Sequence, residues 1–197
     1  MRKIVLLLAV LLVGAGTMMA QTDKEAEKAA KQAEKEAKKA EKAAKKAAEE
    51  AAEQALFEQA VRALDAKDFV VEADRIEFKR GNFVYVSSST NFVVVKGDKA
   101  SIQLSFNVPM PGPNGIGGIT VDGTTSSIEK KTDKKGNITY EMNVQGVAVS
   151  ARVTIRMAKG TNECSATVFP TFNSNRISFS GKLLPSSQSN VFKGRSI

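Results

Sequence analysis

Alternation between apolar and polar residues is the feature that most restricts what this chain can fold into. Downstream of Phe69, apolar side chains recur at every second position, as in Ala100, Ile102, Leu104 and Phe106. Successive side chains of a β-strand point to opposite faces, so this period is typical of strands with one buried and one solvated face. Sheets with one solvated face are commonly antiparallel. The sequence therefore predicts a mainly β, antiparallel domain.

Turn-forming residues interrupt these runs at near-regular intervals, for example at Gly97-Asp98 and Gly136-Asn137. Such pairs favour tight turns between strands. The expected strands cover residues 69–78, 83–88, 91–96, 99–107, 118–130, 137–145, 147–157, 163–170 and 176–184. Short connections between sequential strands imply a meander, which closes into a small barrel or folds into a sandwich. The pattern leaves both architectures open.

A long N-terminal α-helix is predicted to precede the β domain. Residues 23–55 are almost entirely alanine, lysine and glutamate, which are strong helix formers. The alanines recur in alternating steps of four and three, which is the repeat of a coiled coil, but alanine buries too little area to drive association strongly. We therefore favour a single helical spacer, which would reach about 50 Å if fully formed. Self-association through residues 21–55 is the alternative.

The composition of this helix changes at Leu56. Leu56, Phe57, Ala60, Val61 and Leu64 lie at helical spacing and form an apolar face. We expect this short helix, residues 56–67, to pack on the β domain. The chain is thereby divided into a signal peptide at 1–20, a charged helical stalk at 21–55 and a β domain with its packing helix at 56–197.

The first 20 residues are typical of a cleavable export signal. Arg2 and Lys3 precede an apolar run at residues 4–13, which is too short for a permanent membrane span, and small residues then lead to Ala20. Cleavage after Ala20 would leave Gln21 as the first residue. No cysteine lies near the cut, so we expect a soluble protein of the periplasm or extracellular space. We expect neither a lipoprotein nor a transmembrane segment after cleavage.

Histidine is absent, and Cys164 is the sole cysteine. These counts exclude the usual zinc sites and the Ser-His-Asp and Cys-His catalytic centres. An exported chain with one cysteine cannot form an internal disulfide. Cys164 alternates with Ala166 and Val168, so we interpret it as an apolar core residue. We expect no metal and no cofactor.

The chain is moderately basic, with 29 Lys and Arg against 21 Asp and Glu. Lys130, Lys131, Lys134 and Lys135 form a basic tip around Asp133 in a predicted hairpin. The tip is a candidate contact for an anionic lipid or glycan, although a solvated turn is the simpler interpretation. Aromatic residues do not alternate with these cations, so nucleic-acid binding is not expected.

The Gly/Pro-rich loop at residues 109–118 is the most unusual local feature. Glycine permits positive φ and a close approach by a ligand, so Asn114, Gly115, Gly117 and Gly118 are candidates for the rim of a ligand pocket. The loop does not lie between a strand and a helix, so a phosphate-binding or dinucleotide-binding loop is not supported. A structured connection between strands is the alternative interpretation.

Four segments of the β domain carry a family resemblance: Asp74-Arg75-Ile76 and residues 106–123, 172–177 and 191–196. Together with the export signal, they resemble a family of exported Bacteroidota proteins, domain of unknown function 4251. The resemblance covers the β domain and the short helix before it. It implies a bacterial envelope protein, and it implies no ligand and no site residues.

These observations favour a noncatalytic exported envelope protein, with a ligand- or partner-binding β domain on a helical spacer. A soluble meander barrel is a natural container for a ligand. The expected partner is a small ligand or another envelope protein. One alternative is a carboxylate-dependent hydrolase built on Glu72, Asp74 and Glu77, which would need two carboxylates facing one cleft. Another is structural self-assembly through the alanine-rich helix.

Overall fold

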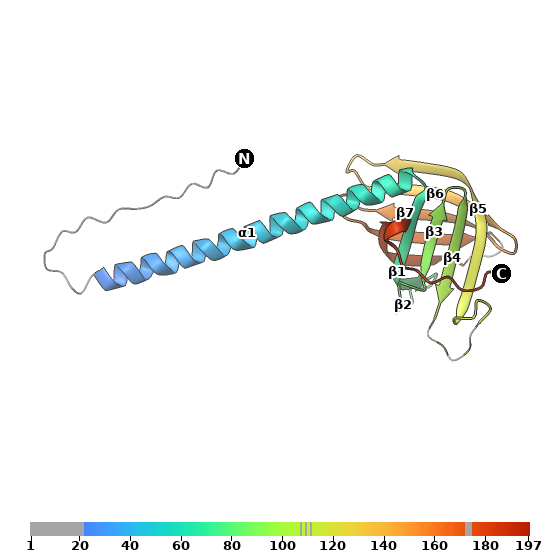
Figure 1. Ribbon diagram of the computed structural model, residues 1–197, viewed down its shortest axis with the longest axis horizontal. Helices are drawn as coiled ribbons and strands as arrows, with labels where there is room; N and C mark the ends of the chain where they lie inside the picture. Colours follow the sequence, from blue (N-terminus) through green and yellow to red (C-terminus); the bar gives the residue numbers. More distant parts are fainter. Residues whose placement is uncertain (1–21, 107, 109, 111, 172–174) are drawn as a thin grey trace. The chain divides into compact units, whose positions relative to one another are not determined.

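The computed structural model describes residues 22–106, 108, 110, 112–171 and 175–197 (Figure 1). The expected export signal at residues 1–20 lies outside these residues. The chain divides into two compact units, residues 1–47 and 48–197. Helix α1 spans Thr22–Asp65, so both helical segments expected from the sequence fall within it. The helix ends where Lys67 adopts a φ of 52°, which a right-handed helix does not allow.

The side chains of α1 differ along its length. From residue 31 to Leu56 they are exposed, whereas Ala60, Ala63 and Leu64 are buried. Within the described residues, no helix has an apolar stretch long enough to cross a membrane. The apolar face expected in the last turns of the helix is therefore the part that is covered.

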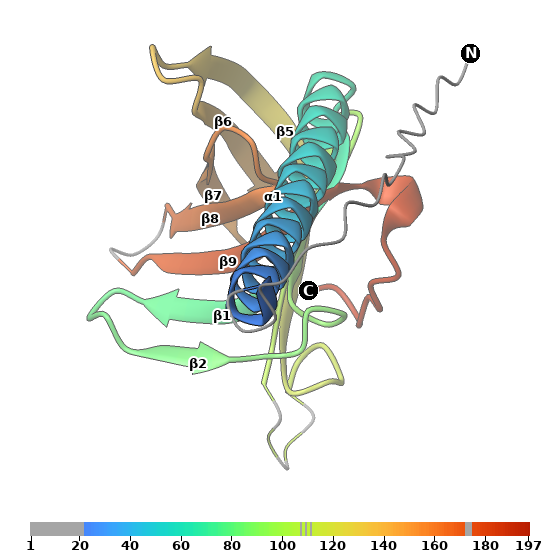
Figure 2. The same ribbon diagram turned by 90° about the vertical axis from the view of Figure 1, so that its left-hand side faces the viewer.

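The second unit contains an antiparallel β-barrel of eight strands. Each strand pairs with the next, and Figure 2 shows β5, β6, β7, β8, β9 and β1 following one another in this order. The barrel strands are β1 (Asp68–Phe78), β3 (Phe92–Lys96), β4 (Lys99–Ser105), β5 (Gly118–Thr132), β6 (Ile138–Gly146), β7 (Ser150–Met157), β8 (Glu163–Pro170) and β9 (Ile177–Pro185). A short strand, β2 (Phe83–Tyr85), pairs with β1 alone, beyond the end of β3. A single 3-10 turn, η1 (Ser186–Gln188), follows β9.

Pairing between β1 and β9 closes the barrel and decides between the two architectures that the sequence left open. The ladder runs from Phe69 opposite Pro185 to Phe78 opposite Ile177, with a bulge between Ala73 and Arg75. Next to the bulge, a Cβ atom on Gly181 would lie 1.9 Å from the Glu72 carbonyl oxygen. Only glycine fits at this close approach of two backbones. The fold is therefore a barrel, and its closure requires a glycine.

All nine strands expected from the sequence are present, although four are shorter than expected. The strand expected at 147–157 begins only at Ser150, and Val147 is fully exposed in the turn between β6 and β7. The amide of Gly146 donates to the Val149 carbonyl and closes this turn at 3.1 Å. Val147 and Val149 continue the alternation of β7 into the turn, so the pattern predicted a strand that begins too early.

The two ends of the barrel are filled differently. The ladder registers bring Asp68, Met157 and Pro185 to one end, which we call the helix-capped end. There Ala60, Ala63 and Leu64 join the same core cluster as the strand residues. Asp65 also forms an ion pair with Lys130 of β5, and Gln188 donates to Gln59 at 3.2 Å. The last turns of α1 therefore close this end.

The core at the helix-capped end contains large side chains. Phe69 and Tyr140 are fully buried and meet edge to face, with ring centroids 5.5 Å apart. Cys164 is buried in the same cluster, which confirms its interpretation as a core residue. Burial raises the pKa of its thiol to about 12, so it stays protonated and unreactive at neutral pH.

The C-terminal strap, residues 189–197, crosses the outside of β3, β4 and β5 (Figure 1). Gln103 of β4 lies beneath it and is fully buried. Its Nε2 donates to the Phe192 carbonyl at 2.8 Å, and its Oε1 accepts from the Gly194 amide at 2.7 Å and the Thr120 hydroxyl at 2.8 Å. The strap thus satisfies a polar side chain on the outer face, which burial would otherwise penalise.

Asp122 of β5 fastens the end of the strap. Its Oδ2 accepts hydrogen bonds from the Lys193 Nζ at 2.6 Å and the Ser196 hydroxyl at 2.5 Å, and its Oδ1 accepts from Ser101. Burial of the carboxyl opposes ionisation, but these hydrogen bonds and the Lys193 charge outweigh it and lower the pKa of Asp122 below 3.8. The ionised carboxylate therefore favours the ordered strap.

Replacing Leu64 by alanine tests the contribution of the helix to the barrel. Leu64 is 1% exposed, so we expect L64A to lower the free energy of unfolding by about 2–5 kcal/mol. Leu56, which is 39% exposed on the same helix, provides the matched control, and L56A should cost less than about 1 kcal/mol. Urea unfolding followed by circular dichroism measures both. Equal costs would contradict capping by the helix.

Protonation of Asp122 should release the strap. Because its pKa is lowered in the folded chain, its stabilising contribution is fully present at neutral pH and disappears as the pH falls through the lowered pKa. D122N should loosen the strap at neutral pH, and trypsin should then cleave after Lys193 and Arg195 several-fold faster, as mass spectrometry can follow. D98N, a neighbouring surface substitution, is the control. Unchanged cleavage in D122N would refute this role for the carboxylate.

Candidate functional site

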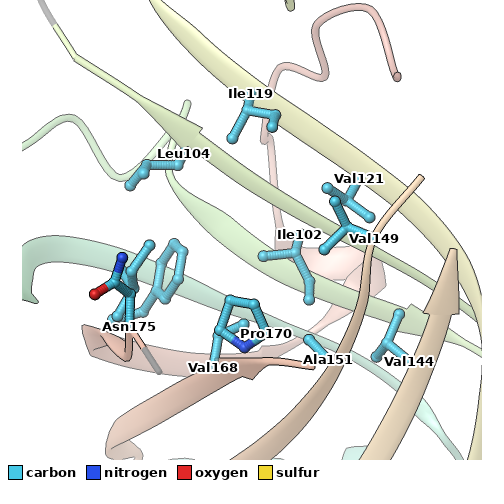
Figure 3. Close-up of a pocket in the computed structure, with 12 residues that line it drawn as sticks. Ile102, Leu104, Ile119, Val121, Val144, Val149, Ala151, Val168, Pro170 and Asn175 are labelled. Carbon is cyan, nitrogen blue, oxygen red and sulfur yellow. The ribbon is translucent and has the colours of Figure 1, made fainter. Parts of the chain in front are cut away.

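A cavity of about 210 Å³ lies inside the barrel at the end opposite the helix (Figure 3). The registers bring Phe78, Ser105, Gly118, Pro170 and Ile177 to this end, which we call the open end. Strands β4 to β9 and the turn before β7 all contribute to the wall. The lining residues are Ile102, Leu104, Ile119, Val121, Val144, Val149, Ala151, Val168, Pro170, Asn175, Ile177 and Phe179.

The lining is almost entirely hydrocarbon. Aliphatic side chains from β4 and β5 face those from β7 and β8 across the space (Figure 3). Among the described residues of the wall, Asn175 has the one polar side chain, and none is a carboxylate or a cation. An uncharged wall of this kind favours apolar groups.

Side-chain volume explains why space remains at this end. Leu64, Phe69 and Tyr140 fill the helix-capped end. The wall of the cavity instead consists mainly of valine and isoleucine, with Ala151 leaving the least filled position. The alternation predicts a buried face that includes Ile102, Leu104 and Val168, and nothing in that pattern distinguishes a filled core from a hollow one.

Asn114, predicted to line a pocket rim, is buried and organises the Gly/Pro-rich loop. Its Oδ1 accepts from the Ile116 and Gly118 amides at 3.1 and 2.9 Å, and its Nδ2 donates to the Leu104 carbonyl at 3.3 Å. The Asn114 carbonyl accepts from the Arg195 amide of the strap at 3.0 Å. Its side chain is engaged in these internal bonds, and Asn114 does not line the cavity.

The three glycines predicted with Asn114 also lie outside the wall of the cavity. A Cβ atom on Gly117 would lie 2.2 Å from the Phe106 carbonyl oxygen, and one on Gly118 would lie 1.9 Å from the Leu104 carbonyl oxygen. Gly115 has a φ of 80° and open space around its Cα. The close contacts give Gly117 and Gly118 a structural reason to be glycine. No ligand contact is needed to explain them.

The predicted basic tip is divided between a strand and a turn. Lys130 and Lys131 belong to β5, where Lys130 pairs with Asp65 and Lys131 pairs with Glu129 at 3.0 Å. Lys134 and Lys135 are exposed in the turn, which the Asp133 side chain organises by accepting from the Lys135 and Asn137 amides at 2.8 and 2.9 Å. Lys130 and Lys131 are thus paired with different carboxylates, and none of the four lysines lines the cavity.

Of the three carboxylates on β1 that the hydrolase alternative needs, Glu72, Asp74 and Glu77, none lines the cavity. Glu72 accepts a hydrogen bond from Ser189 at 2.6 Å, while Asp74 lies in an outer groove with Arg75. Arg75 lies over the Phe83 ring, 5.7 Å from its centroid. In the described part of the chain, no group of three or more Cys, Asp or Glu side chains could hold a metal ion.

A larger groove of about 870 Å³ lies outside the barrel between β2 and the Gly/Pro-rich loop. Val84 and Tyr85 form one side, and Phe106 and Val108 form the other. Tyr85 is 78% exposed, so this groove is open to solvent. The smaller cavity removes a bound group from water more completely, and we take it as the candidate site for that reason.

Comparison with known proteins identifies the family. A family model described as "Domain of unknown function (DUF4251)" matches residues 51–183. A crystal structure of a DUF4251 family protein from Bacteroides eggerthii is 47% identical in sequence, with a TM-score of 0.64. The match covers 75% of this chain and 99% of that protein. No curated protein matches. The sequence match, the extent of the structural match and the barrel together show that this chain belongs to the DUF4251 family.

Proposed function

We propose that the barrel binds a small apolar ligand in the cavity at its open end and that it does so without chemical conversion. The observation that carries this proposal is a space of about 210 Å³ inside the barrel, lined mainly by aliphatic side chains. An engineered cavity of roughly 150 Å³ with a similar lining accepts benzene or xenon. The space here is therefore suited to one ring or one short alkyl chain.

The chemistry of the wall supports binding over catalysis. General acid–base chemistry requires a titratable group within hydrogen-bond reach of the reacting atoms. Asn175 is the one polar residue among the described residues of the wall, and an amide does not titrate. The hydrolase alternative would need two carboxylates at one cleft, and none is among the lining residues that the structure describes.

The size of the cavity limits the affinity. Each buried CH₂ group contributes about 0.8 kcal/mol, so a six-carbon chain would bind with a Kd on the order of a millimolar. Such a value suits a ligand present at high local concentration, or a ligand whose remaining part makes further contacts outside the barrel.

We also propose that the mature chain acts outside the cytoplasm. The pattern of Arg2 and Lys3, the apolar run at residues 4–13 and the small residues before Ala20 supports export. The helix from Thr22 then directly follows the proposed cleavage site. A helix in this position would act as a spacer at the mature N-terminus.

Filling the cavity should abolish ligand binding. A151L places three further carbon atoms in the space, so we expect the affinity for 1-hexanol to fall by about tenfold or more. A158L makes the same chemical change at an exposed position after β7 and should leave binding unchanged. Isoleucine-methyl NMR provides the readout, because Ile102, Ile119 and Ile177 line the cavity whereas Ile138 lies near the helix-capped end. Equal shifts at Ile138 and Ile177, or full binding by A151L, would contradict the proposed site.

Export predicts a defined mature N-terminus. When the full chain is expressed in a bacterium with an active secretion system, Edman sequencing of the protein from the periplasm or medium should begin at Gln21. Substituting Ala20 by a bulky residue (A20F) should block this cleavage, because the peptidase requires a small side chain there. Recovery of uncleaved protein from the cytoplasm of cells expressing the unaltered chain would refute the proposal.

A further inference from the structure

We propose that the ligand of the cavity is an amphiphile with an anionic headgroup, a short alkyl chain ending in a carboxylate or phosphate. This inference rests on the proposed function, because it assumes that the cavity holds the alkyl part. It adds the chemistry of the part that remains outside. The observation behind it is a basic pocket that shares two residues with the wall of the cavity.

The basic pocket lies beside the cavity at the open end of the barrel. Its lining includes Lys79, Arg80, Asn175, Arg176 and Ile177. Asn175 and Ile177 also line the apolar cavity. The two spaces are therefore adjacent at these two residues, one at the start of β9 and one just before it. A ligand that passes Asn175 would leave the hydrocarbon wall and enter a charged one.

The ladder between β1 and β9 explains why the cations converge. Phe78, the last residue of β1, lies opposite Ile177, the first residue of β9. The turn that follows Phe78 carries Lys79 and Arg80, and it is closed by hydrogen bonds from Gly81 to the Phe78 carbonyl at 2.9 Å and from Phe78 to the Asn82 carbonyl at 2.8 Å. Arg176 directly precedes Ile177. Closure of the barrel thus gathers three cations that are distant in sequence.

All charged residues that line this pocket are cations. Lys79, Arg80 and Arg176 are exposed, and no carboxylate is among the residues that line the space. The nearest acid along β1 is Glu77, which is not among the residues that line this pocket. Guanidinium groups bind carboxylate and phosphate in a two-pronged geometry. An anionic headgroup therefore fits beside the apolar cavity.

Ligands that share one tail and differ in headgroup test this inference. We would titrate the full-length protein with 1-hexanol, hexanoate, hexyl phosphate and inorganic phosphate at low salt and follow the Ile102, Ile119 and Ile177 methyl signals. The expected result is that hexanoate and hexyl phosphate bind about five- to tenfold more tightly than 1-hexanol, since exposed charge pairs contribute modestly. This preference should shrink in high salt, where such charges are screened.

Charge-removing variants complete the test. K79Q/R80Q/R176Q should lose the preference for the anions and still bind 1-hexanol, which also shows that the variant is folded. K96Q/K134Q/K135Q removes the same charge near the helix-capped end and should keep the preference. Equal affinity of hexanoate and 1-hexanol would overturn the headgroup inference and leave the apolar site standing. Binding of inorganic phosphate as tight as that of hexyl phosphate would also overturn it. Failure of every ligand to bind would overturn both proposals.

Discussion

Pairing between β1 and β9 is the interaction on which the rest of the structure depends. It joins the two ends of a meander into a closed barrel and gives the sheet an interior. The bulge at Ala73 and the absence of a side chain at Gly181 let the two backbones approach each other at the closing seam. The same seam places Phe78 opposite Ile177 and so brings the β1–β2 turn to the start of β9. Both the apolar cavity and the basic pocket beside it follow from this closure.

The two ends of the barrel differ, because one is packed by the last turns of α1 and the other contains the cavity. The last turns of α1 insert Ala60, Ala63 and Leu64 into the core cluster at one end. The open end has no such cover from the helix, and its smaller aliphatic side chains leave about 210 Å³ unfilled. A cavity costs stability because its wall loses packing contacts. The cavity is confined to the end away from the helix, and this is the observation behind the proposed binding role.

The sequence predicts the strands well because alternation is a local consequence of backbone geometry. It leaves barrel and sandwich undecided, because closure depends on a contact between Phe69 and Pro185, which are distant in the chain. The rim residues illustrate a second limit: Asn114 looks solvent-exposed in a Gly-rich loop, yet its amide is buried among backbone groups. The strap was missed because residues 189–197 show no alternation, and their role depends on the buried Gln103. The sequence predicted a ligand-binding barrel but not the residues that line the cavity, because the position of the unfilled space depends on summed side-chain volumes.

Xenon provides the most direct measurement of the central claim, since it occupies dry apolar cavities without needing a particular headgroup. Crystals of the protein pressurised with xenon should show a single strong anomalous peak inside the open end, between Ile102, Val121 and Ala151, with no peak at the helix-capped end. An empty open end, or a peak beneath α1 near Leu64, would contradict the account of a barrel filled at one end and hollow at the other.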